Sequence, residues 1–311
     1  MFRIRLHGRG GQGIKTAGRI LGSALFGEGF EVQDAPRYGA ERRGAPIFAY
    51  VRADERIICE RGVILRPNLV VVVDDTLLDL PAANVLEGLD NSAVLLINSD
   101  RSVQDWCLQL QLSGPVTVLD AAAVAGKAGR IPAGAVCVGA AARLLGVVSR
   151  EALLQAVAQE LASHGARAIE ASQQAVAQAY DQFSSEEGLV QRLQLGVEKA
   201  SVAPPKWVEL GCEGLPQAAA VVTAAATSRL VKTGLWRTRR PQIDRALCSR
   251  CGLCRILCPE GGIDLDGEGY PVIDYRYCKG CLLCAAQCPR QAIATVEERT
   301  GVPPAPEGDE S

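Results

Sequence analysis

The sequence predicts an α/β chain in two parts, with a mostly parallel three-layer sandwich first and a smaller α+β domain after it. Two observations lead to this prediction. Strand-like and helix-like segments alternate over residues 1–184, which is typical of a parallel sheet covered by helices on both faces. Eight of the 12 cysteines lie between residues 248 and 288, in two copies of one pattern, and this marks a separate unit.

The elements of the first domain follow from short runs rich in Val, Ile and Leu that lie between longer segments with helical spacing. The expected strands are residues 2–6, 46–51, 69–74, 93–98 and 116–119. The expected helices are residues 13–26, 134–148, 150–163 and 166–183. Together these elements place the domain at residues 1–184.

A looser segment follows this domain. Residues 185–233 include Pro204-Pro205 and show little periodicity, which predicts a linker or an extended arm. The second domain is expected at residues 234–300. Residues 301–311 are rich in proline and acidic residues, which predicts a disordered tail.

Composition excludes several classes of function. The formal net charge of −2 argues against a nucleic-acid-binding protein, which normally carries a basic domain or stripe. No apolar run is long enough to cross a membrane, so we expect a cytoplasmic protein with neither nucleic acid nor membrane as a partner. Disulfides rarely persist there, and the clustered cysteines need another explanation. The isolated cysteines are expected to be buried packing residues: Cys59, Cys107, Cys137 and Cys212.

The clustered cysteines follow the pattern C-x2-C-x2-C-x3-C-P at residues 248–259 and again, 30 residues later, at residues 278–289. This spacing is typical of bacterial-type ferredoxin domains with two [4Fe-4S] clusters, where three close cysteines bind one cluster and the fourth binds the other. We assign the first cluster to Cys248, Cys251, Cys254 and Cys288. We assign the second to Cys278, Cys281, Cys284 and Cys258. Paired zinc sites and a disulfide knot are the alternatives, but a third cysteine followed by Cys-Pro is not a zinc pattern.

A glycine-rich turn, GRGGQG at residues 8–13, follows the first expected strand and opens the first helix. It matches the G-x-G-x-x-G fingerprint, in which backbone N–H groups and a helix N-terminus hold a phosphate. Lys15 adds a cation, and Asp34 lies about 20 residues further on, where a ribose-binding acid would be expected. A tight turn without a ligand is the alternative.

Two charged segments are further candidates. Residues 38–46, YGAERRGAP, form a polar turn expected between a helix and a strand, and such loops often hold functional residues. A solvated surface turn is the alternative. The second candidate is a run of basic residues before the first clustered cysteine: Lys232, Arg237, Arg239, Arg240 and Arg245. These residues could dock an acidic partner, or their charges could simply be solvated.

Together these motifs resemble the 2-oxoacid:ferredoxin oxidoreductases. Residues 3–78 are similar to the gamma subunit of the pyruvate-type enzymes through HGRGGQG at 7–13, YGAERRGAP at 38–46 and the apolar strand at 69–75. Residues 232–296 are similar to their delta subunit through KTG at 232–234, GYP at 269–271 and YCKGC at 277–281. The chain therefore resembles a gamma–delta fusion.

This resemblance implies an enzyme that is inactive without alpha and beta subunits, which hold thiamine diphosphate and Mg²⁺. Single electrons pass through the clusters to ferredoxin, and in most members the acyl group passes to coenzyme A. The expected assembly is a dimer of heterotrimers. The expected coenzyme A contacts are Gly10, Gly11, Gln12, Gly13 and Lys15. Arg42 and Arg43 would line or brace the active-site cleft, and no residue of this chain is assigned a catalytic role.

One departure from the family pattern keeps alternatives open. Residues 132–135 read PAGA, where pyruvate-type gamma subunits usually carry an Asn, and this weakens the expectation of coenzyme A. A relative that works without coenzyme A, such as an oxalate oxidoreductase, is one alternative. A second is an NAD(P)-linked ferredoxin reductase using Gly8, Gly10, Gly13 and Asp34. A third is a non-catalytic electron carrier.

Overall fold

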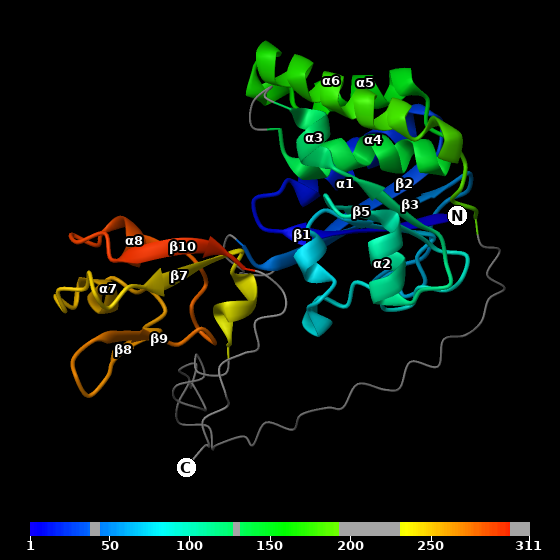
Figure 1. Ribbon diagram of the computed structural model, residues 1–311. Coiled ribbons are helices and arrows are strands. Elements are labelled where there is room, and N and C mark those ends of the chain that lie inside the picture. The colour runs from blue at the N-terminus through cyan, green and yellow to red at the C-terminus, as the bar shows by residue number, and fades with distance from the viewer. Residues whose placement is uncertain (38–43, 127–130, 193–230, 299–311) are drawn as a thin grey trace, which may run out of the picture.

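A computed structural model describes residues 1–37, 44–126, 131–192 and 231–298 of the chain. A larger N-terminal domain and a smaller C-terminal domain lie side by side (Figure 1). The expected cleft residues Arg42 and Arg43 lie outside the described residues, as do most of the expected arm and the expected tail.

The N-terminal domain is built on a six-stranded sheet in the order β2-β3-β1-β4-β5-β6. Its strands are β1 (Phe2–Arg9), β2 (Glu31–Arg37), β3 (Pro46–Asp54), β4 (Leu69–Val72), β5 (Val94–Asn98) and β6 (Val116–Leu119). β1, β4, β5 and β6 pair in parallel, whereas β3 is antiparallel to both β1 and β2. The sheet is therefore mostly parallel, as the alternation of elements predicts.

The helices form more layers than expected. α1 (Ile14–Gly27) and α4 (Ala133–Leu145) pack on one face of the sheet, and α5 (Arg150–Glu160) and α6 (Ala166–Gln182) pack on these two helices (Figure 1). The short α3 (Ala121–Ala125) contacts α4 and α6. α2 (Val103–Leu110) covers the opposite face. The three-layer expectation is not confirmed, because α4 is apolar almost all round and must be covered on both sides.

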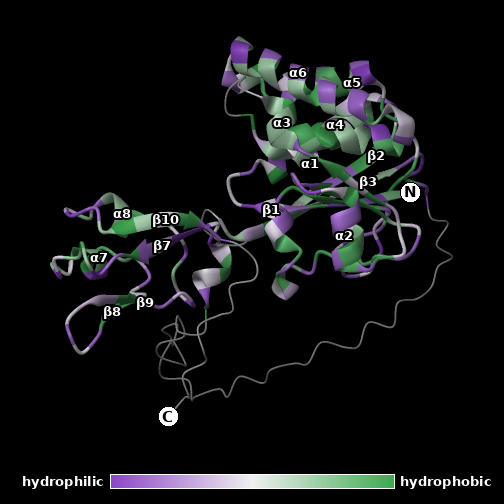
Figure 2. Cartoon of the chain, in the orientation of Figure 1, coloured by the Kyte–Doolittle hydropathy of each residue, from purple (hydrophilic) through white to green (hydrophobic). Residues whose placement is uncertain are grey.

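Two apolar cores lie on the two faces of the sheet. Val71 on β4 points into the core beneath α1 and α4, whereas its neighbours Val70 and Val72 point toward Trp106 on α2. This alternation buries β4 along its whole length, which explains its continuous apolar sequence. Figure 2 shows the apolar α4 between the sheet and the more polar outer helices.

One strand and two α-helices in the described part of the N-terminal domain are absent from the sequence prediction, namely β2, α2 and the short α3. β2 lies at the edge of the sheet, carries Pro36 and has no apolar alternation, so its pattern resembles a loop. Because of β2, the segment between residues 37 and 46 connects two antiparallel strands, and the expectation that it connects a helix to a strand is wrong. α2 is also new, and Ser102 and Asp105 begin it with a reciprocal capping box.

The packing of the N-terminal domain continues past residue 184. Val190 is buried in the core beneath the helices, and the side-chain amide of Asn68 donates a hydrogen bond to the carbonyl oxygen of Gln191 at 3.1 Å. The described part of the domain therefore ends near residue 192.

The C-terminal domain consists of two copies of one structural unit. Strand β7 (Arg239–Ile243) pairs with β10 (Ile293–Glu297), and β8 (Ile263–Leu265) pairs with β9 (Pro271–Ile273). The short helices α7 (Leu253–Ile256) and α8 (Leu283–Ala286) follow the cysteine-rich turns. Ile243 is directly opposite Ile293 and Ile263 is opposite Ile273, so the two halves are held together by matching apolar pairs.

Two further observations concern the described residues. Among them, no helix has both the length and the apolar character that crossing a membrane requires. Cys59 and Cys107 are exposed, so the expectation that they are buried is wrong, whereas Cys137 is buried as expected. Complete burial raises the pKa of Cys137 to about 12. Cys212 lies outside the described residues.

Candidate functional site

The eight clustered cysteines line two separate pockets. One pocket is lined by Cys248, Cys251, Cys254 and Cys288. The other is lined by Cys278, Cys281, Cys284 and Cys258. Each pocket thus combines three close cysteines from one copy of the repeat with the fourth cysteine of the other copy. We call these the first and the second cysteine pocket.

The turns that form the two pockets depend on left-handed backbone at matching positions. In the first copy, positive φ angles occur at Arg250, Gly252 and Gly261. In the second copy, 30 residues later, they occur at Gly280, Leu282 and Gln291. Three of these six residues are not glycine, and a side chain in this region costs free energy. Arg250, Leu282 and Gln291 are not among the residues expected from the sequence, although a glycine stands at each matching position of the other copy and indicates this conformation.

These turns direct backbone N–H groups toward the thiols. The backbone N of Arg250 lies 3.4 Å from Sγ of Cys248, and that of Ala292 lies 3.3 Å from Sγ of Cys288. N–H groups near sulfur stabilise negative charge there, and hydrogen bonds to the sulfurs help to set the reduction potential of iron–sulfur clusters. Both contacts are at the first pocket, where they would stabilise the thiolates of Cys248 and Cys288.

The residues fit two iron–sulfur clusters. Burial raises the pKa of Cys284 to about 11, so this thiol gives up its proton readily only to a strongly bound cation. Ile243, Ile263 and Ile293 form apolar pocket walls that restrict water. Among the described residues, no three His, Cys, Asp or Glu side chains converge as the ligands of a single metal ion would. Each pocket has four cysteines in its lining.

The glycine-rich turn is packed tightly against the second motif. The backbone N of Gly10 donates to the carbonyl oxygen of Ala45 at 2.9 Å, and that of Gly44 donates to the carbonyl oxygen of Gly10 at 3.2 Å. The end of β1 and the start of β3 are thereby joined at the carboxyl edge of β1. Two of the three segments that carry the family resemblance in this domain, residues 7–13 and the described end of 38–46, are therefore direct neighbours.

Gln12 and Gly13 make contacts within the protein. Nε2 of Gln12 donates to Oδ2 of Asp74 at 2.6 Å, and its Oε1 accepts from the backbone N of Arg9 at 2.7 Å. A Cβ atom on Gly13, whose φ is +79°, would lie 2.8 Å from Cβ of Pro132. Gly11 and Lys15 are the exposed members of the expected coenzyme A contacts, whereas Gly10, Gln12 and Gly13 are partly covered.

Asp34 does not occupy the position that a dinucleotide-binding fold requires. In that fold the acidic residue follows the strand parallel to and beside the first one. Here the neighbour of β1 on this side is the antiparallel β3, and Asp34 is an exposed residue within the edge strand β2, opposite Val51. The expectation of an NAD(P) site built from this residue is therefore wrong.

His7 is buried on β1, and its Nε2 has no hydrogen-bond partner among the described residues. Burial, helped by the nearby charge of Arg5, lowers the pKa of His7 to about 3, so the ring stays neutral. It lies beside the ring of Phe48, with centroids 5.8 Å apart. His7 is therefore a buried neutral residue, and one of its ring nitrogens is unsatisfied among the described residues.

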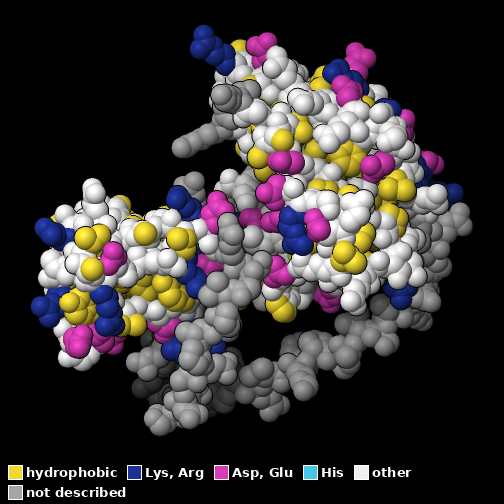
Figure 3. Space-filling view, viewed as in Figure 1, with side chains coloured by type: hydrophobic (Ala, Val, Ile, Leu, Met, Phe, Trp, Pro, Cys, Tyr) yellow, Lys and Arg dark blue, Asp and Glu magenta, His cyan; other side chains and the backbone are white. Residues whose placement is uncertain are grey.

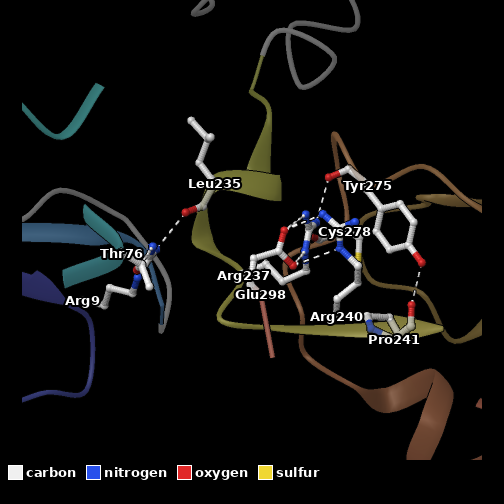
Figure 4. A network of polar contacts seen from close by, with 9 residues as sticks. All are labelled: Arg9, Thr76, Leu235, Arg237, Arg240, Pro241, Tyr275, Cys278 and Glu298. Atoms are coloured by element: carbon white, nitrogen blue, oxygen red, sulfur yellow. Dashed lines mark hydrogen bonds and ion pairs between the residues drawn. The ribbon is translucent and has the colours of Figure 1, made fainter. Parts of the chain in front are cut away.

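A polar network joins the two domains (Figure 4). The guanidinium of Arg9 donates to the carbonyl oxygens of Gly44 at 3.2 Å and Leu235 at 2.8 Å, and to the hydroxyl of Thr76 at 2.8 Å. A Cβ atom on Gly44 would lie 2.8 Å from the carbonyl oxygen of Trp236. The glycine-rich turn therefore supports the segment that leads into the cysteine domain.

The basic run before the first cysteine is largely paired. Arg237 and Arg240 both form ion pairs with Glu298, at 2.7 and 2.6 Å, and Arg245 forms one with Asp266. Its use as a free docking patch is therefore not supported. Figure 3 instead shows basic and apolar side chains side by side on the end of this domain away from the sheet. The exposed apolar residues of the domain include Leu253, Ile256, Leu265 and Leu283.

Comparisons with known proteins match both domains. Residues 3–182 match the family model described as pyruvate ferredoxin/flavodoxin oxidoreductase, and residues 235–298 match a 4Fe-4S dicluster domain. A relative from Thermococcus kodakarensis, named pyruvate/ketoisovalerate oxidoreductases common subunit gamma, is 38% identical over 159 residues, which are 50% of this chain and 85% of the relative.

Further relatives carry similar names. Pyruvate synthase subunit PorC of Methanocaldococcus jannaschii is 40% identical over 158 residues, which are 50% of this chain and 84% of that protein. Among solved structures, pyruvate oxidoreductase subunit PORC of Thermotoga maritima is 33% identical. The match covers 58% of this chain and 95% of that one, with a TM-score of 0.49.

Proposed function

Because the chain belongs to the pyruvate ferredoxin/flavodoxin oxidoreductase family, we propose that it is the gamma–delta subunit of a thiamine-diphosphate-dependent 2-oxoacid:ferredoxin oxidoreductase. In this role it relays electrons from an oxidative decarboxylation to ferredoxin through two [4Fe-4S] clusters. The observation that carries the proposal is the pair of pockets, each lined by three cysteines of one repeat and one of the other.

The cysteines hold the clusters in the sets that line the pockets. Cys248, Cys251, Cys254 and Cys288 hold the first cluster, and Cys278, Cys281, Cys284 and Cys258 hold the second. The clusters, when bound, supply one-electron steps between a two-electron oxidation and a one-electron carrier. The chain's own residues position the thiolates, exclude water with apolar walls and direct N–H groups at sulfur.

Pyruvate or a branched 2-oxoacid is the substrate class that we favour. The relatives are named for pyruvate and ketoisovalerate, and they lend no support to the oxalate alternative. Thiamine diphosphate and Mg²⁺ belong to alpha and beta partners, so the chain is inactive alone. A dimer of heterotrimers and a cytoplasmic location stay predictions.

Coenzyme A is the acyl acceptor that we propose. Gly11 and Lys15 are exposed at the start of α1, where a helix N-terminus favours an anion. Gly10, Gln12 and Gly13 shape the turn through their contacts with Ala45, Asp74 and Pro132. Arg42 and Arg43 remain proposed cleft residues.

The experiment is a purification of the complex without oxygen, followed by iron analysis and a dye-reduction assay. Reduction of a viologen dye is measured with pyruvate, 2-oxoisovalerate, 2-oxoglutarate and oxalate, each with and without coenzyme A. We expect reduction with pyruvate or 2-oxoisovalerate that depends on coenzyme A. A complex that contains thiamine diphosphate and both clusters but oxidises none of these acids would contradict the proposal.

A variant tests the expected coenzyme A contact. Lys15→Ala should raise the KM for coenzyme A by about tenfold, since a charged contact to a phosphate contributes roughly 1–2 kcal/mol. The KM for the 2-oxoacid should not change. Arg19→Ala is the matched control, because Arg19 is a cation one turn further along the same helix and pairs with Glu160.

A further inference from the structure

Arg237 is a buried cation directly behind the second cysteine pocket, and only 6% of its side chain is exposed. Nη1 donates to the carbonyl oxygen of Cys278 at 2.7 Å and to that of Tyr275 at 2.8 Å (Figure 4). A Cβ atom on Gly280 would lie 2.8 Å from Cγ of Arg237. The turn between Cys278 and Cys281 therefore rests against this side chain.

The charges around Arg237 do not cancel. Its Nε and Nη2 donate to Glu298, each at 2.7 Å, and Nη2 of Arg240 donates to the same carboxylate at 2.6 Å. Two positive charges against one negative charge leave one positive charge. Lys279 and Glu260, which line the second pocket, form an ion pair at 2.6 Å, so their charges cancel.

The excess charge is protected from solvent. Burial alone would lower the pKa of Arg237, but the contacts with Glu298 outweigh it and raise the pKa, so the guanidinium stays protonated. The ring of Tyr275 lies under both guanidinium groups, with its centroid 5.1 Å from Arg237 and 4.5 Å from Arg240. A buried charge acts through a lower dielectric constant than an exposed one and is screened less by salt.

The first cysteine pocket has no comparable buried charge among the described residues. Arg250 lines this pocket, but it is exposed and lies over Tyr270 at 5.2 Å. Arg245 is 57% exposed and is neutralised by Asp266. The two pockets are related by the repeat, yet within the described part of the chain only the second has a buried, uncompensated cation behind its cysteine turn.

We propose that Arg237 sets the reduction potential of the second cluster and holds it above that of the first. The proposal rests on the proposed function, because it concerns a cluster bound by Cys278, Cys281, Cys284 and Cys258. Reduction adds one electron to the cluster, with no bond made or broken. A fixed positive charge nearby stabilises the added negative charge and makes reduction easier. Arg237 is thus a positioning and tuning residue that does not itself carry the electron.

The test is a redox titration of the complete chain with both clusters in place, followed by electron paramagnetic resonance. We expect two reduction steps. Arg237→Gln should lower the potential of the higher step and leave the lower step unchanged. Glu298→Gln removes the compensating negative charge and should raise the same step. Arg237 and Glu298 are partners in one ion pair, and loosened packing alone would not shift the reduction potential in opposite directions when each is replaced.

Two more variants complete the test. Arg237→Lys keeps the positive charge, so the potential of the higher step should stay close to that of the wild-type chain. This variant tests the role of the charge if Arg237→Gln fails to assemble the cluster. Arg250→Gln is the matched control at the first pocket and should move only the lower step, by less, because Arg250 is exposed.

The outcomes separate this inference from the proposed function. Chain with far less iron than two [4Fe-4S] clusters require would overturn the proposed function. Two intact clusters whose potentials do not respond to Arg237→Gln and Glu298→Gln would overturn only the inference. The same holds if Arg237→Gln and Arg250→Gln shift the same step.

Discussion

The Nη1 atom of Arg9 lies 2.8 Å from the carbonyl oxygen of Leu235, a residue 226 positions further along the chain. The same guanidinium pairs with Asp74 at 3.3 Å, and only 4% of the Arg9 side chain is exposed. One side chain of the glycine-rich motif therefore stabilises the N-terminal domain and also holds the segment that leads to the cysteines.

Arg9→Met should destabilise the N-terminal domain by about 3 kcal/mol, because it leaves the mostly buried carboxylate of Asp74 without its cation. Urea unfolding followed by circular dichroism measures this loss. Arg9→Lys is the matched variant, since it keeps the charge but cannot reach all its partners. It should lose less stability but still speed amide hydrogen exchange over Thr233–Trp236. Unchanged exchange in both variants would show that Arg9 does not hold the two domains together.

Cys288→Ala should remove the cluster of the first pocket, although Cys288 is nearest in sequence to the cysteines of the second. The reason is the crossing of the fourth cysteine, which places Cys288 beside Cys248, Cys251 and Cys254. Cys258→Ala should remove the other cluster in the same way. Each variant should retain about half of the iron, and the two should lose different reduction steps.

Cys59→Ala is the control for these variants, because Cys59 is exposed and lies far from the repeat in sequence. It should retain all the iron. If Cys288→Ala and Cys258→Ala instead lost the same reduction step, the crossed assignment would be wrong.

The cluster ligands could be predicted because the short spacing between the cysteines is itself diagnostic of iron–sulfur binding. The second copy of the pattern supports the same assignment independently. The backbone conformation within the repeat was harder to predict. Leu282 adopts the left-handed conformation that Gly252 adopts in the first copy, and no local propensity predicts this conformation for a leucine. The apolar strand β4 was equally clear, since burial on both faces leaves no polar position. The edge strand β2 could not be predicted in this way. It pairs only with β3, on one side, so its sequence does not need the apolar pattern of a buried strand.

The glycine-rich turn shows a second limit of the sequence. Its fingerprint is compatible with phosphate binding, with tight packing or with both, and only the fold shows that Gly13 meets Pro132 and that Gln12 meets Asp74. Both partners are more than 60 residues away along the chain. Spacing alone cannot reveal contacts of this kind.

Gly13→Ala should destabilise the chain by about 2–3 kcal/mol, from the strain of a positive φ and from contact with Pro132. Gly29→Ala is the matched control, because Gly29 also has a positive φ, of 87°, but nothing lies within 4 Å of the added Cβ atom. It should cost about 1 kcal/mol from strain alone. Thermal or urea unfolding measures both, and the difference between them gives the packing contribution. Equal losses would mean that Pro132 moves aside freely.

His7 should make the stability of the chain depend on pH in a mildly acidic window. Its pKa is lowered from 6.5 to about 3 by burial and by Arg5, so the folded state keeps the ring neutral while the unfolded state protonates it. The contribution is complete above pH 6.5 and is lost as the pH falls toward 3. At pH 5 the loss should be about 2 kcal/mol relative to pH 7.

The chain has only two histidines, which makes this prediction easy to isolate. His7→Phe should unfold with a free energy that changes by about 2 kcal/mol less between pH 7 and pH 5 than that of the wild-type chain. Acid effects on other groups are common to both proteins and cancel in the comparison. His164→Gln is the control, because His164 is exposed and should leave the pH dependence as it is. If His7→Phe kept the wild-type slope, the folded state would have to accommodate a proton on His7. Its unpaired Nε2 would then have a partner outside the described residues.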